Sequence, residues 1–175
     1  MRQLFFFLIL FILLVSEGVA IDLLPNILTS KSTLIVPHWI FVFLFLIVLF
    51  YDRQDTFFAI GYGVVFGLFI DVAYVGVLGV YMFVYPLTLY IMQLLKGMLQ
   101  TNIYITILMT VIGITMIETL LYFIYTFIGT IDTTWSYFAI YRLLPTVLAN
   151  LILFIPLYFI CMDWLMKWSN ERFDK

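Results

Sequence analysis

The chain has 175 residues, of which 66% are hydrophobic and only 10% charged, and its formal net charge at pH 7 is -2. A water-soluble domain of this size could not hide so much apolar surface, because its exterior must meet water. So small a net charge also gives no basis for nucleic-acid binding. Because the apolar runs are long and do not alternate as barrel strands do, we expect an all-α integral membrane protein in the lipid bilayer. Residues 1–175 would form a single transmembrane domain.

Six apolar segments follow one another along the chain, and short polar connections join them. A membrane-spanning helix needs about 20 mostly apolar residues, with a lower limit of roughly 17. The expected membrane-spanning helices together make a six-helix transmembrane bundle, and they cover Leu4–Val15 (extending towards Leu24), Leu34–Tyr51, Phe57–Val72, Leu78–Leu95, Ile103–Ile128 and Phe138–Leu165.

The first segment has two interpretations. Arg2, the apolar run and the small residues Gly18 and Ala20 resemble a signal peptide with its cleavage site. The alternative is a first helix that is retained in the mature protein. We favour retention, because no soluble secreted domain follows that a signal peptide would deliver.

Basic residues near the helix ends predict the orientation of the bundle. Lysine and arginine collect on the cytoplasmic side of membrane proteins. With six helices and a cytoplasmic N-terminus, the C-terminus is also cytoplasmic, and only Lys31 and Arg142 lie outside. The basic residues on the cytoplasmic side are then Arg2, Arg53, Lys96, Lys167, Arg172 and Lys175.

Small residues recur at every fourth position of the third segment, at Ala59, Gly63 and Gly67, and Asp71 continues the series. Four-residue spacing places them on one helix face. Small residues allow another helix backbone to approach closely. The face therefore serves either packing within the bundle or the docking of a separate membrane protein.

Three charged residues interrupt the apolar runs, namely Asp71, Glu118 and Arg142. Ionisable groups at membrane depth are costly and usually face protein or a cavity. The expected topology brings all three to one layer in the outer half of the membrane, with Thr146 and Asn150 on the same face of the last helix as Arg142. This buried polar layer is either a pocket that opens outwards or a structural ion pair. We interpret the nearby His38 as an interfacial residue rather than a ligand.

Residues that would carry catalysis are missing from the sequence. A single histidine excludes most zinc hydrolase designs, and the single cysteine, Cys161, cannot form an intrachain disulfide or a cysteine-based metal site. Neither a Gly-x-Ser-x-Gly nucleophile elbow nor a phosphate-binding Walker loop is present. We therefore expect a protein without enzymatic activity, metal or cofactor.

Two stretches of the sequence resemble the bacterial rod shape-determining MreD family. The first runs from Gly63 through Gly67 to Asp71 and is followed by Leu78-Gly79, which is similar to that family's Gly-Leu-x-x-Asp segment and later Leu-Gly. The second runs from Tyr141 to Asn150, reads Tyr-Arg-Leu-Leu-Pro-Thr-Val-Leu-Ala-Asn, and looks like the family's last helix. The helix number and chain length agree over nearly the whole sequence.

This resemblance implies a non-enzymatic subunit of the cell-wall elongation machinery in the bacterial plasma membrane. The family partners with the bitopic protein MreC and, through it, with RodA, a class B transpeptidase and MreB. It also resembles the substrate-binding subunits of energy-coupling-factor vitamin transporters, which have six helices and an outward-facing pocket. Two functions therefore stand side by side, an interaction scaffold for cell shape and a substrate-binding transport subunit.

Overall fold

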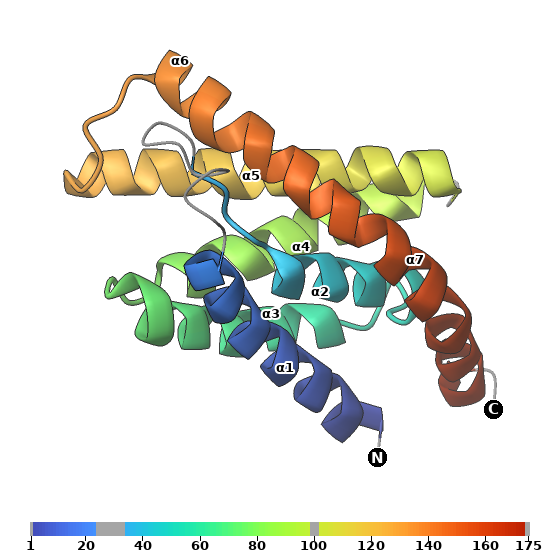
Figure 1. Ribbon diagram of the computed structural model, residues 1–175. Coiled ribbons are helices and arrows are strands. Elements are labelled where there is room, and N and C mark those ends of the chain that lie inside the picture. The colour runs from blue at the N-terminus through green and yellow to red at the C-terminus, as the bar shows by residue number, and fades with distance from the viewer. Residues whose placement is uncertain (1, 24–33, 99–101, 174–175) are drawn as a thin grey trace.

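Helices make up most of the molecule, which is represented by a computed structural model that describes residues 2–23, 34–98 and 102–173. The described residues form six helical segments, which confirms the expected number, and Figure 1 shows them packed in one bundle. The last segment runs without interruption from Trp135 to Phe173 and begins with two short helical elements. The elements are α1 (Arg2–Leu23), α2 (Trp39–Phe50), α3 (Phe58–Ile70) with the π-helical turn η1 (Asp71–Val75), α4 (Val80–Met98), α5 (Ile103–Ile128), and α6 (Trp135–Phe138) with η2 (Ala139–Leu143) and α7 (Leu144–Phe173).

Four helical stretches in the described residues are long and apolar enough to cross a membrane. They are Arg2–Ala20, Phe58–Val75, Ile103–Ile128 and Trp135–Phe173. Helix α2 has only 12 residues, which is about 18 Å of helix and less than the roughly 30 Å of hydrocarbon in a bilayer. The prediction that one helix covers Leu34–Tyr51 is therefore wrong. Residues 34–38 are not helical, because Pro37 disfavours helical backbone at the residue before it.

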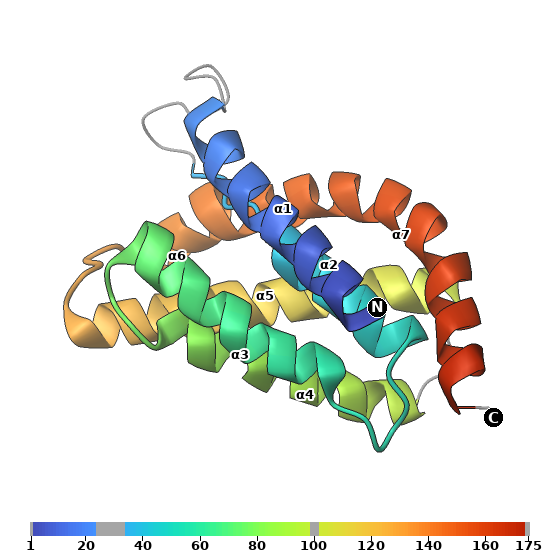
Figure 2. The same cartoon turned by 90° about the horizontal axis from the view of Figure 1, so that it is seen from below.

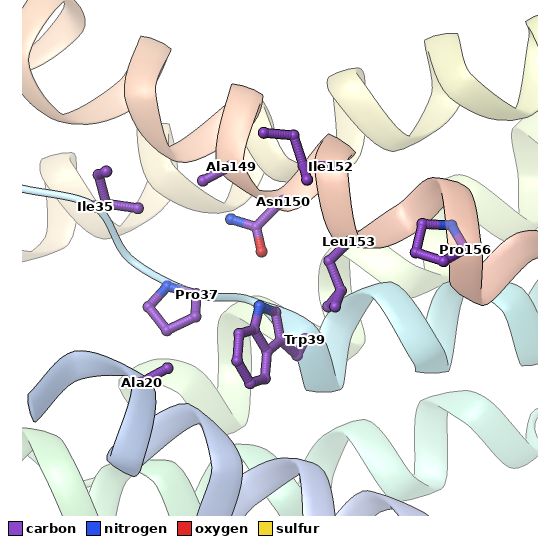
Figure 3. Close-up of a pocket in the computed structure, with 9 residues that line it drawn as sticks. All are labelled: Ala20, Ile35, Pro37, Trp39, Ala149, Asn150, Ile152, Leu153 and Pro156. Atoms are coloured by element: carbon purple, nitrogen blue, oxygen red, sulfur yellow. The ribbon is translucent and has the colours of Figure 1, made fainter. Parts of the chain in front are cut away.

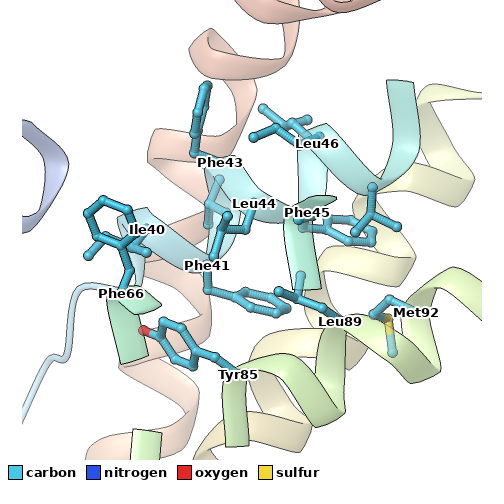
Figure 4. Packing of buried hydrophobic residues seen from close by; sticks show 14 of the residues in the cluster. Ile40, Phe41, Phe43, Leu44, Phe45, Leu46, Phe66, Tyr85, Leu89 and Met92 are labelled. Atoms are coloured by element: carbon cyan, nitrogen blue, oxygen red, sulfur yellow. The ribbon is translucent and has the colours of Figure 1, made fainter. Parts of the chain in front are cut away.

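Helix α2 forms the centre of the bundle. All ten residues from Ile40 to Leu49 are buried, and the helix contacts α1, α3, α4 and α7. Figure 4 shows Phe41 beside Tyr85 and Leu89 of α4, with Phe66 of α3 nearby. A helix that is hydrophobic on every side lies either among other helices or in lipid, and here other helices surround it. The short central helix therefore depends on its neighbours for both packing and hydrogen bonding.

Helix α7 wraps around one side of this core. It contains Pro156, which removes one backbone hydrogen bond, and Figure 2 shows the helix curving along its length. The curve brings the C-terminal turns to the start of α1, where Phe5 packs edge-on against Trp164 and Trp168. Both ends of the chain consequently lie at the same end of the bundle (Figure 1).

Candidate functional site

A stretch of extended chain, residues 34–38, leads into the central helix at the end of the bundle opposite the chain ends. Its backbone is held by the polar face of α7. Thr146 Oγ1 accepts from the N–H of Val36 at 3.1 Å, and Asn150 Oδ1 accepts from the N–H of His38 at 2.7 Å. The amide nitrogen of Asn150 donates to the carbonyl of Val36 at 2.9 Å. Non-helical backbone at membrane depth is tolerated only where protein groups satisfy it, and Thr146 and Asn150 do so here.

Glu17 of α1 completes this support from the opposite side. Its Oε1 accepts from the backbone N–H of Ile40 at 2.8 Å, in the first turn of α2. The first N–H groups of a helix have no partner within the helix, and the helix dipole favours a negative group there. His38 at the N-cap position provides no side-chain cap, so the glutamate of a neighbouring helix takes that role.

A chain of side-chain hydrogen bonds joins four elements beneath this segment. His38 Nε2 lies 2.8 Å from Glu118 Oε1 on α5, and His38 Nδ1 lies 3.0 Å from the hydroxyl of Tyr85 on α4. Arg142 of η2 donates from Nε to Glu118 Oε2 at 2.7 Å. A carboxylate only accepts hydrogen bonds, so Nε2 carries the hydrogen of its bond to Glu118, and in a neutral ring Nδ1 then accepts from Tyr85.

The network brings together most of the predicted polar layer. Glu118, Thr146 and Asn150 are fully buried, and the side chain of Arg142 is 20% exposed. The ion pair between Arg142 and Glu118 is the structural alternative foreseen from the sequence. Each described polar atom of His38, Glu118 and Asn150 that is buried has a partner. The arrangement braces four elements against one another and, among the described residues, contains no group of three metal-ligating side chains.

Asp71 takes no part in the ion pair of Glu118 and Arg142, with which the sequence prediction grouped it. Its carboxylate accepts from the backbone N–H groups of Gly79, Tyr81 and Met82 at 2.9, 2.9 and 3.1 Å. It therefore caps the start of α4, where the helix dipole favours a negative charge. The tight turn that allows this has Gly76 and Gly79 at φ values of 72° and 96°, which favour glycine.

The small-residue face of α3 packs inside the bundle. A Cβ at Gly67 would lie 2.6 Å from the carbonyl oxygen of Tyr81 and 2.8 Å from the Cα of Met82, and one at Gly63 would lie 2.9 Å from the side chain of Leu89. Ala59 is also buried. Of the two alternatives for this face, the structure therefore shows packing of α3 against α4, which leaves no room there for a separate protein.

Polar side chains also hold the other end of the central helix. Lys96 of α4 donates to the carbonyls of Val48 and Asp52 at 2.7 and 2.8 Å, and Ser169 of α7 donates to the carbonyl of Tyr51 at 2.9 Å. A cation is favourable at the C-terminus of a helix. Burial raises the pKa of the Asp52 carboxyl in the adjoining connection to about 6, although hydrogen bonds from Ala59 and the charge of Lys96 act in the opposite direction.

Three residues that hold the start of α2 were misread or missed in the sequence. His38 was interpreted only as an interfacial residue, whereas the structure shows it fully buried and bonded through both ring nitrogens. Glu17 interrupts an apolar run and could have been recognised as a buried cap for that reason. Tyr85 lies among several other aromatic residues of α4, and no sequence signal separates it from them.

An apolar groove opens between α1 and α7 beside the extended segment. Figure 3 shows Pro37 and Trp39 on its floor, with Ala20 on one side and Ala149 on the other. The cavity has a volume of about 380 Å³. Helices α1 and α7 meet near the chain ends, through Phe5, but are separated here.

Comparisons with known proteins agree with the resemblance seen in the sequence. A family model described as rod shape-determining protein MreD matches residues 1–168. The curated "Rod shape-determining protein MreD" of Bacillus subtilis (strain 168) is 28% identical over 145 residues, which cover 81% of this chain and 83% of that protein. No solved structure matches, so likeness to energy-coupling-factor subunits stays a prediction. The family match extends over nearly the whole chain, and the chain belongs to the rod shape-determining MreD family.

Proposed function

We propose that this family member acts in rod-shape determination by binding MreC within the bacterial plasma membrane, as a non-enzymatic subunit that crosses the bilayer several times. Through MreC it would be connected to RodA, a class B transpeptidase and MreB. The observation that carries the proposal is the family match over residues 1–168. The geometry adds that the buried polar groups near Glu118 are engaged in bracing helices, as suits a scaffold.

The groove between α1 and α7 is the docking place that we propose for the membrane segment of MreC. It is apolar, it lies beside the exposed faces of two long helices, and Ala20 and Ala149 leave space for a close approach. The small-residue face of α3 is already occupied by α4. The groove is thus the better candidate among the described surfaces.

Substitution at the rim of the groove tests this proposal. Ala149→Trp would fill the groove, and we expect recovery of tagged MreC with the purified protein to fall to roughly a tenth. The matched control is Leu148→Trp, because the neighbouring Leu148 is 55% exposed and does not line the groove. Recovery would be measured by quantitative immunoblot at equal membrane levels of both variants. Undiminished recovery with Ala149→Trp would exclude the groove, and no recovery with wild type would exclude MreC as a partner.

The orientation that we propose places both chain ends in the cytoplasm. Basic residues gather at that end: Arg2 pairs with Glu171, Arg53 lies 5.0 Å from the ring of Phe173, and Lys96 lies nearby. Arg142 lies at the opposite end. Lys31 and Lys175, which also entered the prediction, lie outside the described residues. The charge distribution supports an inside location for the chain ends.

Reporter fusions would measure this orientation directly. Alkaline phosphatase and green fluorescent protein fused after Lys96 and after the C-terminus should report a cytoplasmic location. A fusion at Thr133, in the connection between α5 and α6, should report an external one. An external C-terminus would contradict the proposed topology.

A further inference from the structure

A second cavity lies near the chain ends, between the α2–α3 connection and α4. Its volume is about 400 Å³. Gln54, Asp55 and Phe57 line it from the connection, and α4 contributes four residues, Tyr90, Gln93, Leu94 and Gly97. The bracing network around Glu118 lies at the opposite end of the bundle, and the groove between α1 and α7 has no lining residue in common with this cavity.

Gln93 is more than nine-tenths buried and has one polar atom without a partner. Its Nε2 donates to the carbonyls of Arg53, Gln54 and Thr56 at 3.1, 3.3 and 2.9 Å. Three carbonyl acceptors around one atom assign it as the nitrogen, so Oε1 is the free acceptor. A buried acceptor without a donor is unfavourable. Oε1 is itself buried, so a ligand donor in this cavity satisfies it once the Gln93 amide turns towards the cavity.

The remaining lining favours a cation. Asp55 is exposed and carries a carboxylate, while none of the lining residues is basic. Phe57 and Tyr90 are half-exposed, at 50% and 46%, and offer aromatic faces. A carboxylate, an amide oxygen and aromatic faces are the groups that bind an ammonium ion, through charge-assisted hydrogen bonds and cation–π attraction.

An apolar strip continues from this cavity along α4 into the membrane. Phe83, Tyr90 and Leu94 are exposed and are spaced by seven and four residues, which places them on one helix face. The acyl chains of a lipid would lie along such a strip, whereas a basic side chain from a cytoplasmic peptide would leave it uncovered. We propose that this cavity binds the primary ammonium headgroup of a phospholipid in the leaflet on the side of the chain ends.

Lipid titrations of the purified full-length protein in detergent test the proposal. A lipid that binds the folded state stabilises it, and a tighter lipid stabilises it more. The shift of the thermal unfolding midpoint therefore measures the affinity for each lipid. Phosphatidylethanolamine should bind about threefold to tenfold more tightly than phosphatidylcholine with the same acyl chains, because the quaternary ammonium has no N–H to donate. Equal affinity for the two lipids would overturn the proposal.

Asp55→Asn keeps the shape of the side chain and removes its charge, and it should abolish most of the preference for phosphatidylethanolamine. Asp132→Asn, an exposed acid in the connection that follows α5, is the matched control and should leave the preference intact. An unchanged preference in Asp55→Asn would place the lipid elsewhere. If a short lysine peptide stabilises the protein as strongly as phosphatidylethanolamine, and loses this effect in Asp55→Asn, the occupant is a protein side chain and the lipid proposal is wrong. These results do not depend on recovery of MreC.

Discussion

Gly67→Leu should destabilise the protein by about 3 kcal/mol, at the upper end of the range for overpacked cores, because the new side chain has no space that a rotamer change could open. The nearest atoms to its Cβ belong to the backbone of Tyr81 and Met82, at 2.6–2.8 Å, and backbone cannot move without separating α3 from α4. This is the most extensive helix pair in the structure. We expect a sharply lowered thermal unfolding midpoint in detergent and a reduced amount of protein in membranes.

The control for this change is Gly61→Leu in the same helix. A Cβ at Gly61 has no heavy atom within 4 Å, and leucine favours helix more than glycine does. This variant should accumulate as the wild type does, with an equal or slightly higher unfolding midpoint. If both leucine variants behave alike, α3 and α4 do not pack as described.

Arg142→Ala should destabilise the protein more than the double change Arg142→Ala with Glu118→Gln. The single change leaves Glu118 Oε2 buried and without its donor, while the negative charge remains. Breaking a buried ion pair from one side costs about 3 kcal/mol or more, and replacing both charges costs less. In the double variant, glutamine can still accept from His38 and carries no charge. Thermal unfolding of the wild type, both single variants and the double variant gives the coupling free energy directly.

A coupling free energy near zero would contradict this interpretation of the network. The double variant should recover roughly 1–3 kcal/mol relative to the sum of the single changes, in the range measured for residues in one hydrogen-bonded network. Strictly additive losses would mean that Arg142 and Glu118 do not interact in the folded protein. Arg172→Ala, near the chain ends, is a suitable comparison for the single change Arg142→Ala. Arg172 donates to the neutral hydroxyl of Tyr51, so its removal leaves that hydroxyl without a donor but no carboxylate without its cation.

Helix number and the grouping of basic residues could be predicted because both depend on properties of single segments. Runs of apolar residues specify helices in lipid, and basic residues at helix ends specify the sides of the membrane. The extended segment before α2 could not be recognised in the same way. Residues 34–38 continue an apolar run, and only Pro37 marks the break. The hydrogen bonds that stabilise this segment come from Thr146 and Asn150, which are more than a hundred residues away in the sequence.

Asp71 shows a second limit of inference from sequence. Topology predicts the depth of a residue in the membrane, and on depth alone Asp71 lies in the same layer as Glu118 and Arg142. It does not predict the position around the bundle, which depends on how helices pack. The glycines at 76 and 79 were the available signal, because they allow the tight turn in which the carboxylate caps α4.

Complementation tests the proposal that this chain serves rod-shape determination by docking MreC between α1 and α7. A rod-shaped host depleted of its own MreD would express the wild type, Ala149→Trp or Leu148→Trp at matched membrane levels, and cell length and width would be measured. The wild type and Leu148→Trp should restore rods, whereas Ala149→Trp should leave cells round. Rods of normal width with Ala149→Trp would contradict the proposal.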